Sequence, residues 1–164
     1  MSLKVQINLP TEADTDLLGQ KLAQAISFCL HSIESKGFNI RLEGNLGAGK
    51  TSLIRAILRA LGFNGRVKSP TFTLLETYSI KNVKFNHFDF YRFEDPEEFD
   101  DAGFRESFGP GQITATEWTD KAVPFVPKED LKIIFYFQDA GRNVDLISSS
   151  NLGDQILTKM SELR

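Results

Sequence analysis

The sequence has little of what disulfide-bonded, zinc-binding or membrane-spanning proteins need. It contains one cysteine, Cys29, and two histidines among 164 residues, so an internal disulfide is impossible and a Cys/His zinc site is excluded. No apolar run approaches the roughly 20 residues that cross a bilayer, and the start, MSLKVQINLP, lacks the charged-then-apolar pattern of a signal peptide. We therefore expect a cytoplasmic protein that does not associate with membranes.

An excess of positive charge is also missing. Lysines and arginines number 19 against 22 aspartates and glutamates, which gives a net charge of -3. A surface that binds nucleic acid through many phosphates needs clustered Lys and Arg, so we expect any nucleic-acid role to depend on a partner. The composition, 41% hydrophobic and 25% charged, is typical of a soluble globular protein, and we expect a single domain over residues 1–164.

The apolar pattern predicts helices and strands in mixed order. Helical spacing predicts helices over residues 11–37, 51–62 and 151–163. Aromatic, β-branched and alternating runs predict strands over residues 38–43, 71–80, 83–93, 112–118, 131–138 and 144–148. Short turns join two pairs of these strands, at Lys81 with Asn82 and at Asp139, Ala140 and Gly141. This order predicts α/β layers around a mixed sheet, with a parallel centre and antiparallel hairpins.

One glycine-rich stretch, GNLGAGKTS from Gly44 to Ser52, lies between a predicted strand and a predicted helix. It satisfies the Walker A pattern of a glycine, four residues and then Gly-Lys-Thr. The backbone N–H groups of such a loop surround phosphate oxygens, and the next helix directs its positive end there. A plain glycine turn is the alternative, which the flanking elements disfavour. The expected nucleotide-binding residues are Asn45, Leu46, Gly47, Ala48, Gly49, Lys50, Thr51 and Ser52.

Lys50 and Thr51 are the loop residues with side-chain chemistry. Lys50 is expected to reach the β- and γ-phosphates, and the Thr51 hydroxyl to bind the Mg²⁺ that bridges them. The magnesium shell also needs a carboxylate near the carboxyl end of a neighbouring strand. Asp89, in HFDFYR, and Glu117, in ITATEW, both fit, although each could instead be a solvated acid. Thr71, in SPTFTLLE, offers a hydroxyl of the kind that nucleotide switches use to sense the γ-phosphate.

Two other residues near these motifs have weaker signals. His87 lies two residues before Asp89 and therefore on the same face of a strand. A half-buried structural histidine is favoured over a role beside the metal site. Arg92 could supply positive charge to a transition state, as arginine fingers do, but an ordinary ion pair is favoured.

Four segments together resemble one family: LEGNLGAGKTSLIRAIL, VKSPTFTLLETY, HFDFYRFEDPEEFDDAGF and TEW. In this order they resemble the TsaE (YjeE) family over about residues 10–148. TsaE proteins are bacterial P-loop ATPases that work with the TsaD and TsaB proteins to make threonylcarbamoyladenosine on tRNA. The resemblance implies a three-layer fold similar to P-loop NTPases, ATP and Mg²⁺ as cofactors, and TsaD and TsaB as partners through which tRNA is reached.

The resemblance also implies roles for individual residues. Asp89 becomes the Walker B-like metal carboxylate, and Glu117 a second essential acid near the metal and the γ-phosphate. The implied catalytic residues are Lys50, Asp89 and Glu117, and the implied metal-binding residues are Thr51, Asp89 and Glu117. Ser69, Pro70 and Thr71 fall in a switch-like loop. Trp118 is expected beside the site, with a plain core tryptophan as the alternative.

The expected function is Mg-dependent ATP hydrolysis that is slow alone and accelerated by partners, because a small domain rarely supplies every transition-state contact. A small-molecule kinase is one alternative. Such kinases generally need an acceptor pocket and a mobile lid that carries arginines. The arginines after the loop are sparse and do not form an obvious lid: Arg66, Arg92, Arg105 and Arg142. A non-catalytic subunit that senses nucleotide is another alternative. A GTPase is disfavoured because no N/T-K-x-D motif follows the phosphate loop.

Overall fold

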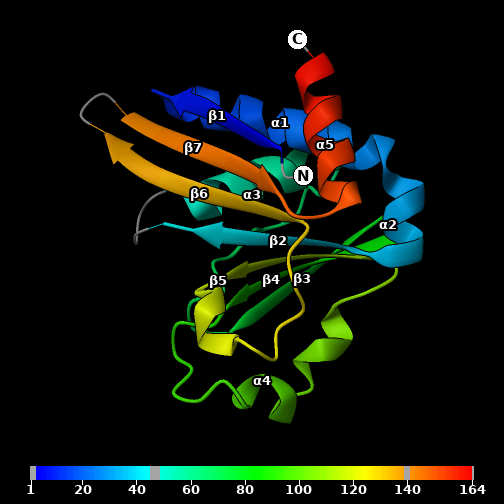
Figure 1. Cartoon of the computed structure of the whole chain (residues 1–164), viewed down its shortest axis with the longest axis vertical. Coiled ribbons are helices and arrows are strands. Elements are labelled where there is room, and N and C mark those ends of the chain that lie inside the picture. Colours follow the sequence, from blue (N-terminus) through cyan, green and yellow to red (C-terminus); the bar gives the residue numbers. More distant parts are fainter. Residues whose placement is uncertain (1–2, 45–48, 139–140, 164) are drawn as a thin grey trace.

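Seven strands form a mixed sheet in the order β1-β7-β6-β2-β5-β4-β3 (Figure 1). The computed structural model describes residues 3–44, 49–138 and 141–163. The strands are β1 (Lys4–Leu9), β2 (Phe38–Glu43), β3 (Leu75–Ile80), β4 (Val83–Asp89), β5 (Gln112–Glu117), β6 (Leu131–Gln138) and β7 (Gly141–Ser148). The four central strands, β6, β2, β5 and β4, are parallel, whereas β1 with β7, β7 with β6, and β3 with β4 pair antiparallel. The predicted parallel centre with antiparallel hairpins is confirmed.

Strand limits differ from the prediction where the backbone turns. Residues 71–74 are not part of β3, because Leu74 has a φ of 67° and ends a turn. Trp118 likewise lies outside β5, with a φ of 54°. Residues 90–93 follow the end of β4. Strand β1 was not predicted, although its alternation of Val5, Ile7 and Leu9 with polar residues is a period-2 pattern.

The helices are α1 (Glu12–Phe28), α2 (Leu30–Lys36), α3 (Lys50–Ala60), α4 (Glu98–Asp101) and α5 (Asn151–Glu162), with two 3₁₀ turns, η1 (Phe104–Ser107) and η2 (Thr119–Ala122). Thr11 caps α1 in a capping box with Asp14. The single helix predicted over residues 11–37 is wrong in one respect, because it is interrupted at Cys29. There φ is -97° and ψ is 14°, outside the α region, so the chain starts a second helix.

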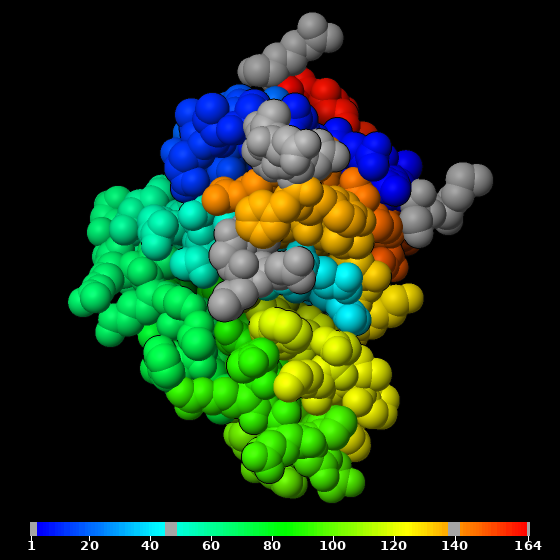
Figure 2. Space-filling view, turned by 90° about the vertical axis from the view of Figure 1, so that its left-hand side faces the viewer, coloured from blue at the N-terminus to red at the C-terminus, as the bar shows by residue number. Residues whose placement is uncertain are grey.

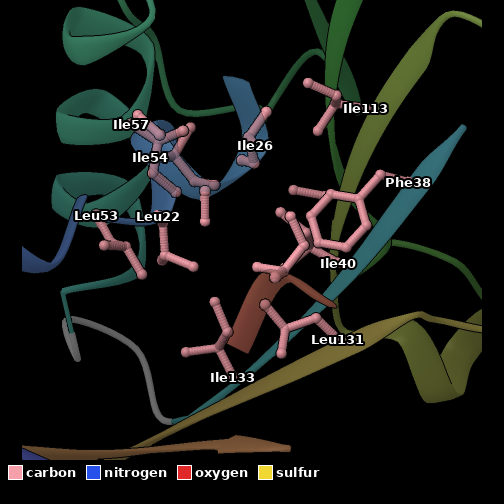
Figure 3. Packing of buried hydrophobic residues seen from close by; sticks show 14 of the residues in the cluster. Leu22, Ile26, Phe38, Ile40, Leu53, Ile54, Ile57, Ile113, Leu131 and Ile133 are labelled. Carbon is pink, nitrogen blue, oxygen red and sulfur yellow. The ribbon is translucent and has the colours of Figure 1, made fainter. Parts of the chain in front are cut away.

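An aliphatic core lies between the sheet and the helices α1, α3 and α5. Figure 3 shows Leu22 and Ile26 of α1 and Ile54 of α3 facing Phe38 and Ile40 of β2. All five side chains are at most 1% exposed. Full burial of such a side chain stabilises the fold by about 1.5–3 kcal/mol. This packing fixes α3 against β2, and with it Gly44 and Gly49, the two described glycines of the predicted phosphate loop.

A second core, rich in phenylalanine, covers the other face of β4. Phe88 of β4 has ring centroids of Phe90, Phe104 and Phe108 at 5.2, 4.9 and 5.7 Å. Phe99 of α4 is fully buried in the same cluster. The third layer of the predicted fold is therefore built here from α4, η1, η2 and the loops around them.

The parallel strands β2, β4, β5 and β6 all end at one edge of the sheet (Figure 1). Figure 2 looks onto that edge and shows the β6–β7 hairpin in orange, the region of α3 in blue-green, and the segments around β4 and β5 in green and yellow. Ligands of open α/β sheets bind outside the carboxyl ends of the strands. This edge is where the predicted site residues are expected to meet.

Candidate functional site

The phosphate-loop motif connects β2 directly to α3. Gly49 has a φ of 97° and immediately precedes Lys50, the first residue of α3. A left-handed residue at this point favours glycine, and α3 begins at the next residue. Asn45, Leu46, Gly47 and Ala48 lie outside the described residues, so their binding role stays a prediction.

A pocket of about 220 Å³ opens beside the start of α3. Its lining residues are Gly49, Lys50, Thr51, Ser52, Ser69, Thr71, Asp89, Glu117, Trp118 and Arg142. Nine of these ten residues were predicted from the sequence, although their chain segments are far apart. Pro70 was predicted with Ser69 and Thr71 but is buried and does not line the pocket. The hydroxyls of Ser69 and Thr71 are 2.7 Å apart.

Glu117 is the centre of a buried polar network. Its Oε2 atom lies 2.6 Å from Nε2 of His87, and its Oε1 atom lies 3.4 Å from Nζ of Lys50. Lys50 also donates a hydrogen bond of 2.7 Å to the carbonyl oxygen of Gly44. Lys50, His87 and Glu117 are each at most 6% exposed. Both oxygens of this carboxylate therefore face cationic or N–H groups at the entrance to the phosphate loop.

His87 contributes more than the sequence indicated. It was predicted as a half-buried structural histidine, but it is fully buried and contacts Glu117. Its Nδ1 atom has no hydrogen-bond partner among the described residues, so the contact with Glu117 is the polar interaction that the structure gives this ring. The prediction that His87 and Asp89 share one face of a strand is consistent with this geometry. The partner of His87 is Glu117, which lies 30 residues away, so residue spacing could not identify it.

Asp89 and Glu117 lie side by side, because they are register partners in the parallel pair β4–β5. Oδ1 of Asp89 accepts a hydrogen bond of 3.0 Å from the backbone N–H of Tyr91. Burial, together with the nearby charge of Glu117, raises the pKa of Asp89 above its ordinary value. Two adjacent buried carboxylates of which one resists ionisation favour a bound cation between them.

The pKa of Glu117 moves in the opposite direction. Burial opposes its ionisation, but the hydrogen bond with His87 and the charges of His87 and Lys50 outweigh this effect and lower the pKa of Glu117. The two neighbouring acids therefore differ in character. Glu117 is held as a carboxylate with fixed partners, whereas Asp89 gains most from a cation that neutralises it.

The side chains at the pocket offer oxygen ligands suited to Mg²⁺, but they do not form a complete metal site by themselves. Thr51, Asp89 and Glu117 all line it, and hydroxyl and carboxylate oxygens are ligands that Mg²⁺ prefers. No cluster of three or more His, Cys, Asp or Glu side chains that could hold a metal occurs in residues 3–44, 49–138 and 141–163. A Mg²⁺ ion here would need further oxygens, as it does where it shares its shell with substrate phosphates.

Trp118 borders the pocket and also packs against the aromatic core. It adopts a left-handed conformation before η2, its ring centroid is 5.0 Å from that of Tyr91, and Nζ of Lys50 is 5.8 Å from it. Trp118 is thus both a packing residue and a wall of the site. Arg92 forms no ion pair within the described part of the chain, contrary to the prediction. Its guanidinium lies 4.8 Å from the ring of Phe72.

Arg142 is the pocket residue that the sequence reasoning missed. It belongs to β7, just after the predicted hairpin turn, and the hairpin brings it opposite Gly49. The signal was available in principle. A strand parallel to β2 must end at the same edge of the sheet as β2, and Arg142 lies near the start of the antiparallel strand that returns from that edge.

Comparison with known proteins points to one family. A family model described as threonylcarbamoyl adenosine biosynthesis protein TsaE matches residues 9–144. The tRNA threonylcarbamoyladenosine biosynthesis protein TsaE of Haemophilus influenzae is 39% identical over 153 residues, which cover 93% of this chain and 95% of that protein. The protein of the same name from Bacillus subtilis is 34% identical over 111 residues, covering 68% of this chain and 69% of that protein.

A solved structure supports the fold. The crystal structure of YdiB from Bacillus subtilis superposes with a TM-score of 0.71 at 24% identity and covers 99% of this chain and 95% of that one. At this identity the likeness concerns the arrangement of the elements. Within the described residues, no helix is both long enough and apolar enough to cross a membrane.

Proposed function

This chain belongs to the TsaE family of tRNA threonylcarbamoyladenosine biosynthesis proteins, and from that premise we propose that it binds Mg-ATP and hydrolyses it. Hydrolysis serves the tRNA modification indirectly, by resetting a complex of the partner proteins TsaB and TsaD. ATP is the substrate and Mg²⁺ the cofactor. Contact with tRNA is made through the partners.

One observation carries the proposal: the buried network of Lys50, Glu117 and His87 lies at the start of α3, beside Asp89. The distances of 3.4 and 2.6 Å from Glu117 to Lys50 and His87 place a lysine, a fixed carboxylate and a second acid in one pocket with Thr51. An ion pair that only stabilised the fold would not need to lie at the start of α3 beside Thr51 and Asp89. In proteins with a Walker A motif, the nucleotide phosphates bind at the start of the helix that follows the motif. The network lies at the corresponding place in this chain, which supports the proposal.

In the proposed mechanism, each side chain has a separate task. The ammonium of Lys50 exchanges its contact with the Gly44 carbonyl for the β- and γ-phosphates. Thr51 and Asp89 would hold Mg²⁺, and the ion would neutralise charge on those phosphates. Glu117 accepts a hydrogen bond from the attacking water and orients it toward the γ-phosphorus, while His87 keeps the carboxylate in place. The products are ADP and inorganic phosphate.

The proposal includes a low rate without partners. Two large aromatic side chains near the pocket are exposed, Phe72 at 77% and Tyr91 at 54%. Phe72 follows Thr71 in the switch-like loop, and the N–H of Tyr91 binds Asp89. Exposed apolar residues so close to a site support contact with a partner protein there. A transition-state contact supplied in trans accelerates a P-loop enzyme by roughly 10³–10⁵.

The experiment is phosphate release from Mg-ATP by the purified protein, alone and with TsaB and TsaD, for the wild type and Glu117→Gln. We expect slow release that the partners accelerate and that Glu117→Gln abolishes while ATP binding persists. Glu106→Gln, at an exposed position of η1, is the matched control and should behave as the wild type.

Two results would contradict hydrolysis as the function. If ATP binds but no phosphate is released with or without partners, the protein is a nucleotide sensor, or a kinase that lacked its acceptor. If Glu117→Gln releases phosphate at the wild-type rate, Glu117 does not orient the water.

A further inference from the structure

We infer that Arg142 is a nucleotide-binding residue, which contacts the α- and β-phosphates of the bound nucleotide from the β6–β7 hairpin. The inference rests on the proposed function, because it adds a second cation to the same pocket. It makes the hairpin, and not only the phosphate loop and α3, part of the nucleotide site.

The position of Arg142 is set by the sheet. It lies opposite Phe137 of β6 and Leu9 of β1, so strands pair with β7 on both sides at this residue. Its side chain reaches the start of α3, where a Cβ atom added to Gly49 would be 2.7 Å from Nη1 and 3.2 Å from Cζ. The guanidinium therefore lies against the backbone of the last loop glycine. Any larger residue at position 49 would displace it.

The charge of Arg142 is only weakly engaged by its neighbour. Nη1 lies 3.6 Å from Oε2 of Glu12, whose side chain is 59% exposed. Such an exposed pair contributes little. A guanidinium has five N–H donors in a planar fork that matches two phosphate oxygens at once. Arg142 is 28% exposed and lines the pocket, so it can exchange Glu12 for an anion in the pocket with little rearrangement.

The strand order decides which phosphates Arg142 meets. Strand β2, which the motif follows in sequence, has β5 and β4 on one side and β6 and β7 on the other. Asp89 and Glu117, the acids proposed for the metal and the water, are on the β5–β4 side and mark the γ-phosphate end. The backbone of a Walker A loop holds the α- and β-phosphates, and its lysine reaches the β- and γ-phosphates. Arg142, on the far side, faces the α/β end.

This placement separates Arg142 from an arginine finger. A finger acts on the charge that develops during γ-phosphoryl transfer and changes the rate. A contact with the α- and β-phosphates is the same in ATP and ADP, so it changes affinity for both and leaves the rate at saturating ATP nearly unaltered.

The test is calorimetric titration of the full chain with Mg-ATP and with Mg-ADP, for the wild type, Arg142→Met and Arg142→Lys. Lys128→Met is the matched control, because it removes one exposed positive charge just before β6, at the opposite edge of the sheet. We expect Arg142→Met to weaken the binding of both nucleotides by roughly 10- to 100-fold. Arg142→Lys should lose less affinity, and Lys128→Met should bind both nucleotides as the wild type does. The loss of affinity in Arg142→Met should be smaller at high salt.

Three outcomes would overturn the inference, and they are distinguishable. Wild-type affinity in Arg142→Met, with an unchanged melting temperature, removes Arg142 from the site and leaves the proposed function standing. A loss confined to Mg-ATP, with a reduced turnover rate, assigns Arg142 to the γ-phosphate instead. A wild-type protein that binds neither nucleotide defeats the proposed function and this inference together.

Discussion

The two sides of the pocket are built on opposite principles. The acidic wall, made by His87, Asp89 and Glu117 at the ends of β4 and β5, is at most 6% exposed and internally hydrogen bonded. The basic wall is the side chain of Arg142, which is partly exposed, lies against Gly49 and, among the described residues, pairs with the exposed Glu12 at 3.6 Å. Breaking a buried charge pair costs about 3–5 kcal/mol, whereas an exposed pair contributes about 0–1 kcal/mol.

This difference indicates a division of labour. The acidic wall is preorganised, because strand register and the phenylalanine core behind it fix where each carboxylate points. The basic wall is adjustable, because an exposed arginine can change partners at small cost. Preorganisation suits groups that orient a reaction, and adjustability suits a group that captures a ligand and releases it. Four predictions test this contrast, in order of decreasing effect.

Removing the support behind the acidic wall should have the largest effect on stability. Phe88 lies between His87 and Asp89 in β4 and packs on the opposite face, fully buried. We expect Phe88→Ala to lower the free energy of unfolding by about 3–5 kcal/mol, measured by urea denaturation. Phe137→Ala is the matched control, since Phe137 pairs with Arg142 and is 56% exposed. It should cost less than about 1 kcal/mol; equal losses would refute the contrast.

Asp89→Asn should reduce catalysis and increase stability. If the proposed ATPase function holds, turnover should fall roughly 100- to 1,000-fold, because the proposed Mg²⁺ would lose a charged ligand. The raised pKa of Asp89 means that its contribution to stability is present below the unfolded pKa and is lost as pH rises through the folded pKa. At pH 7 the asparagine variant should therefore unfold at higher urea than the wild type, with the difference vanishing in acid. A lower urea midpoint at pH 7 would contradict the assigned pKa direction.

Glu117→Gln should change stability in the opposite sense. The lowered pKa of Glu117 means that its contribution is present above the unfolded pKa and is lost as pH falls through the folded pKa. We expect the glutamine variant to be about 1–3 kcal/mol less stable at pH 7, with its deficit disappearing below the ordinary glutamate range. Urea denaturation from pH 7 down to pH 3 measures this, and a stabilised variant at pH 7 would show that burial outweighs His87 and Lys50.

Glu12→Gln should have the smallest effect, since it removes the exposed partner of Arg142. The free energy of unfolding should fall by at most about 1 kcal/mol, and less at high salt. Glu162→Gln provides the comparison, because Glu162 pairs with Lys159 at 3.5 Å and is similarly exposed at 61%. Thermal melts in low and high salt measure both. A loss of several kcal/mol in Glu12→Gln would show that the basic wall is rigid.

Much of this molecule could be predicted from local pattern. The strand at 38–43, the antiparallel pairing of both hairpins and the closing helix are confirmed, because each depends on side-chain periodicity and turn residues close together in the chain. The second hairpin differs in one limit, since β7 begins at Gly141, which was predicted as a turn residue. The predicted site residues Lys50, Thr51, Asp89 and Glu117 line one pocket, and their roles there stay predictions. Motif spacing identifies such residues when each one ends a strand or begins a helix.

The errors arose where a residue's neighbours are distant in sequence or its backbone is unusual. The interruption at Cys29 and the left-handed Trp118 are backbone conformations that hydrophobic spacing does not encode. His87 was undervalued because its partner lies 30 residues away. Arg142 was grouped with scattered arginines because only the sheet order places it beside Gly49.

The residue pattern alone identifies the side chains available for chemistry: a Walker A sequence motif between a strand and a helix, two acids at strand ends, and the Ser69–Thr71 segment. These features depend on residue type and short spacing, which a linear chain records. The relative positions of those groups depend on the folded sheet. Parallel pairing of β4 with β5 places Asp89 beside Glu117, and the pKa values of these two acids move in opposite directions, while the order of β2, β6 and β7 places Arg142 against Gly49. Charge interactions and burial depend on distances in space, and those are set by the packing of the whole sheet.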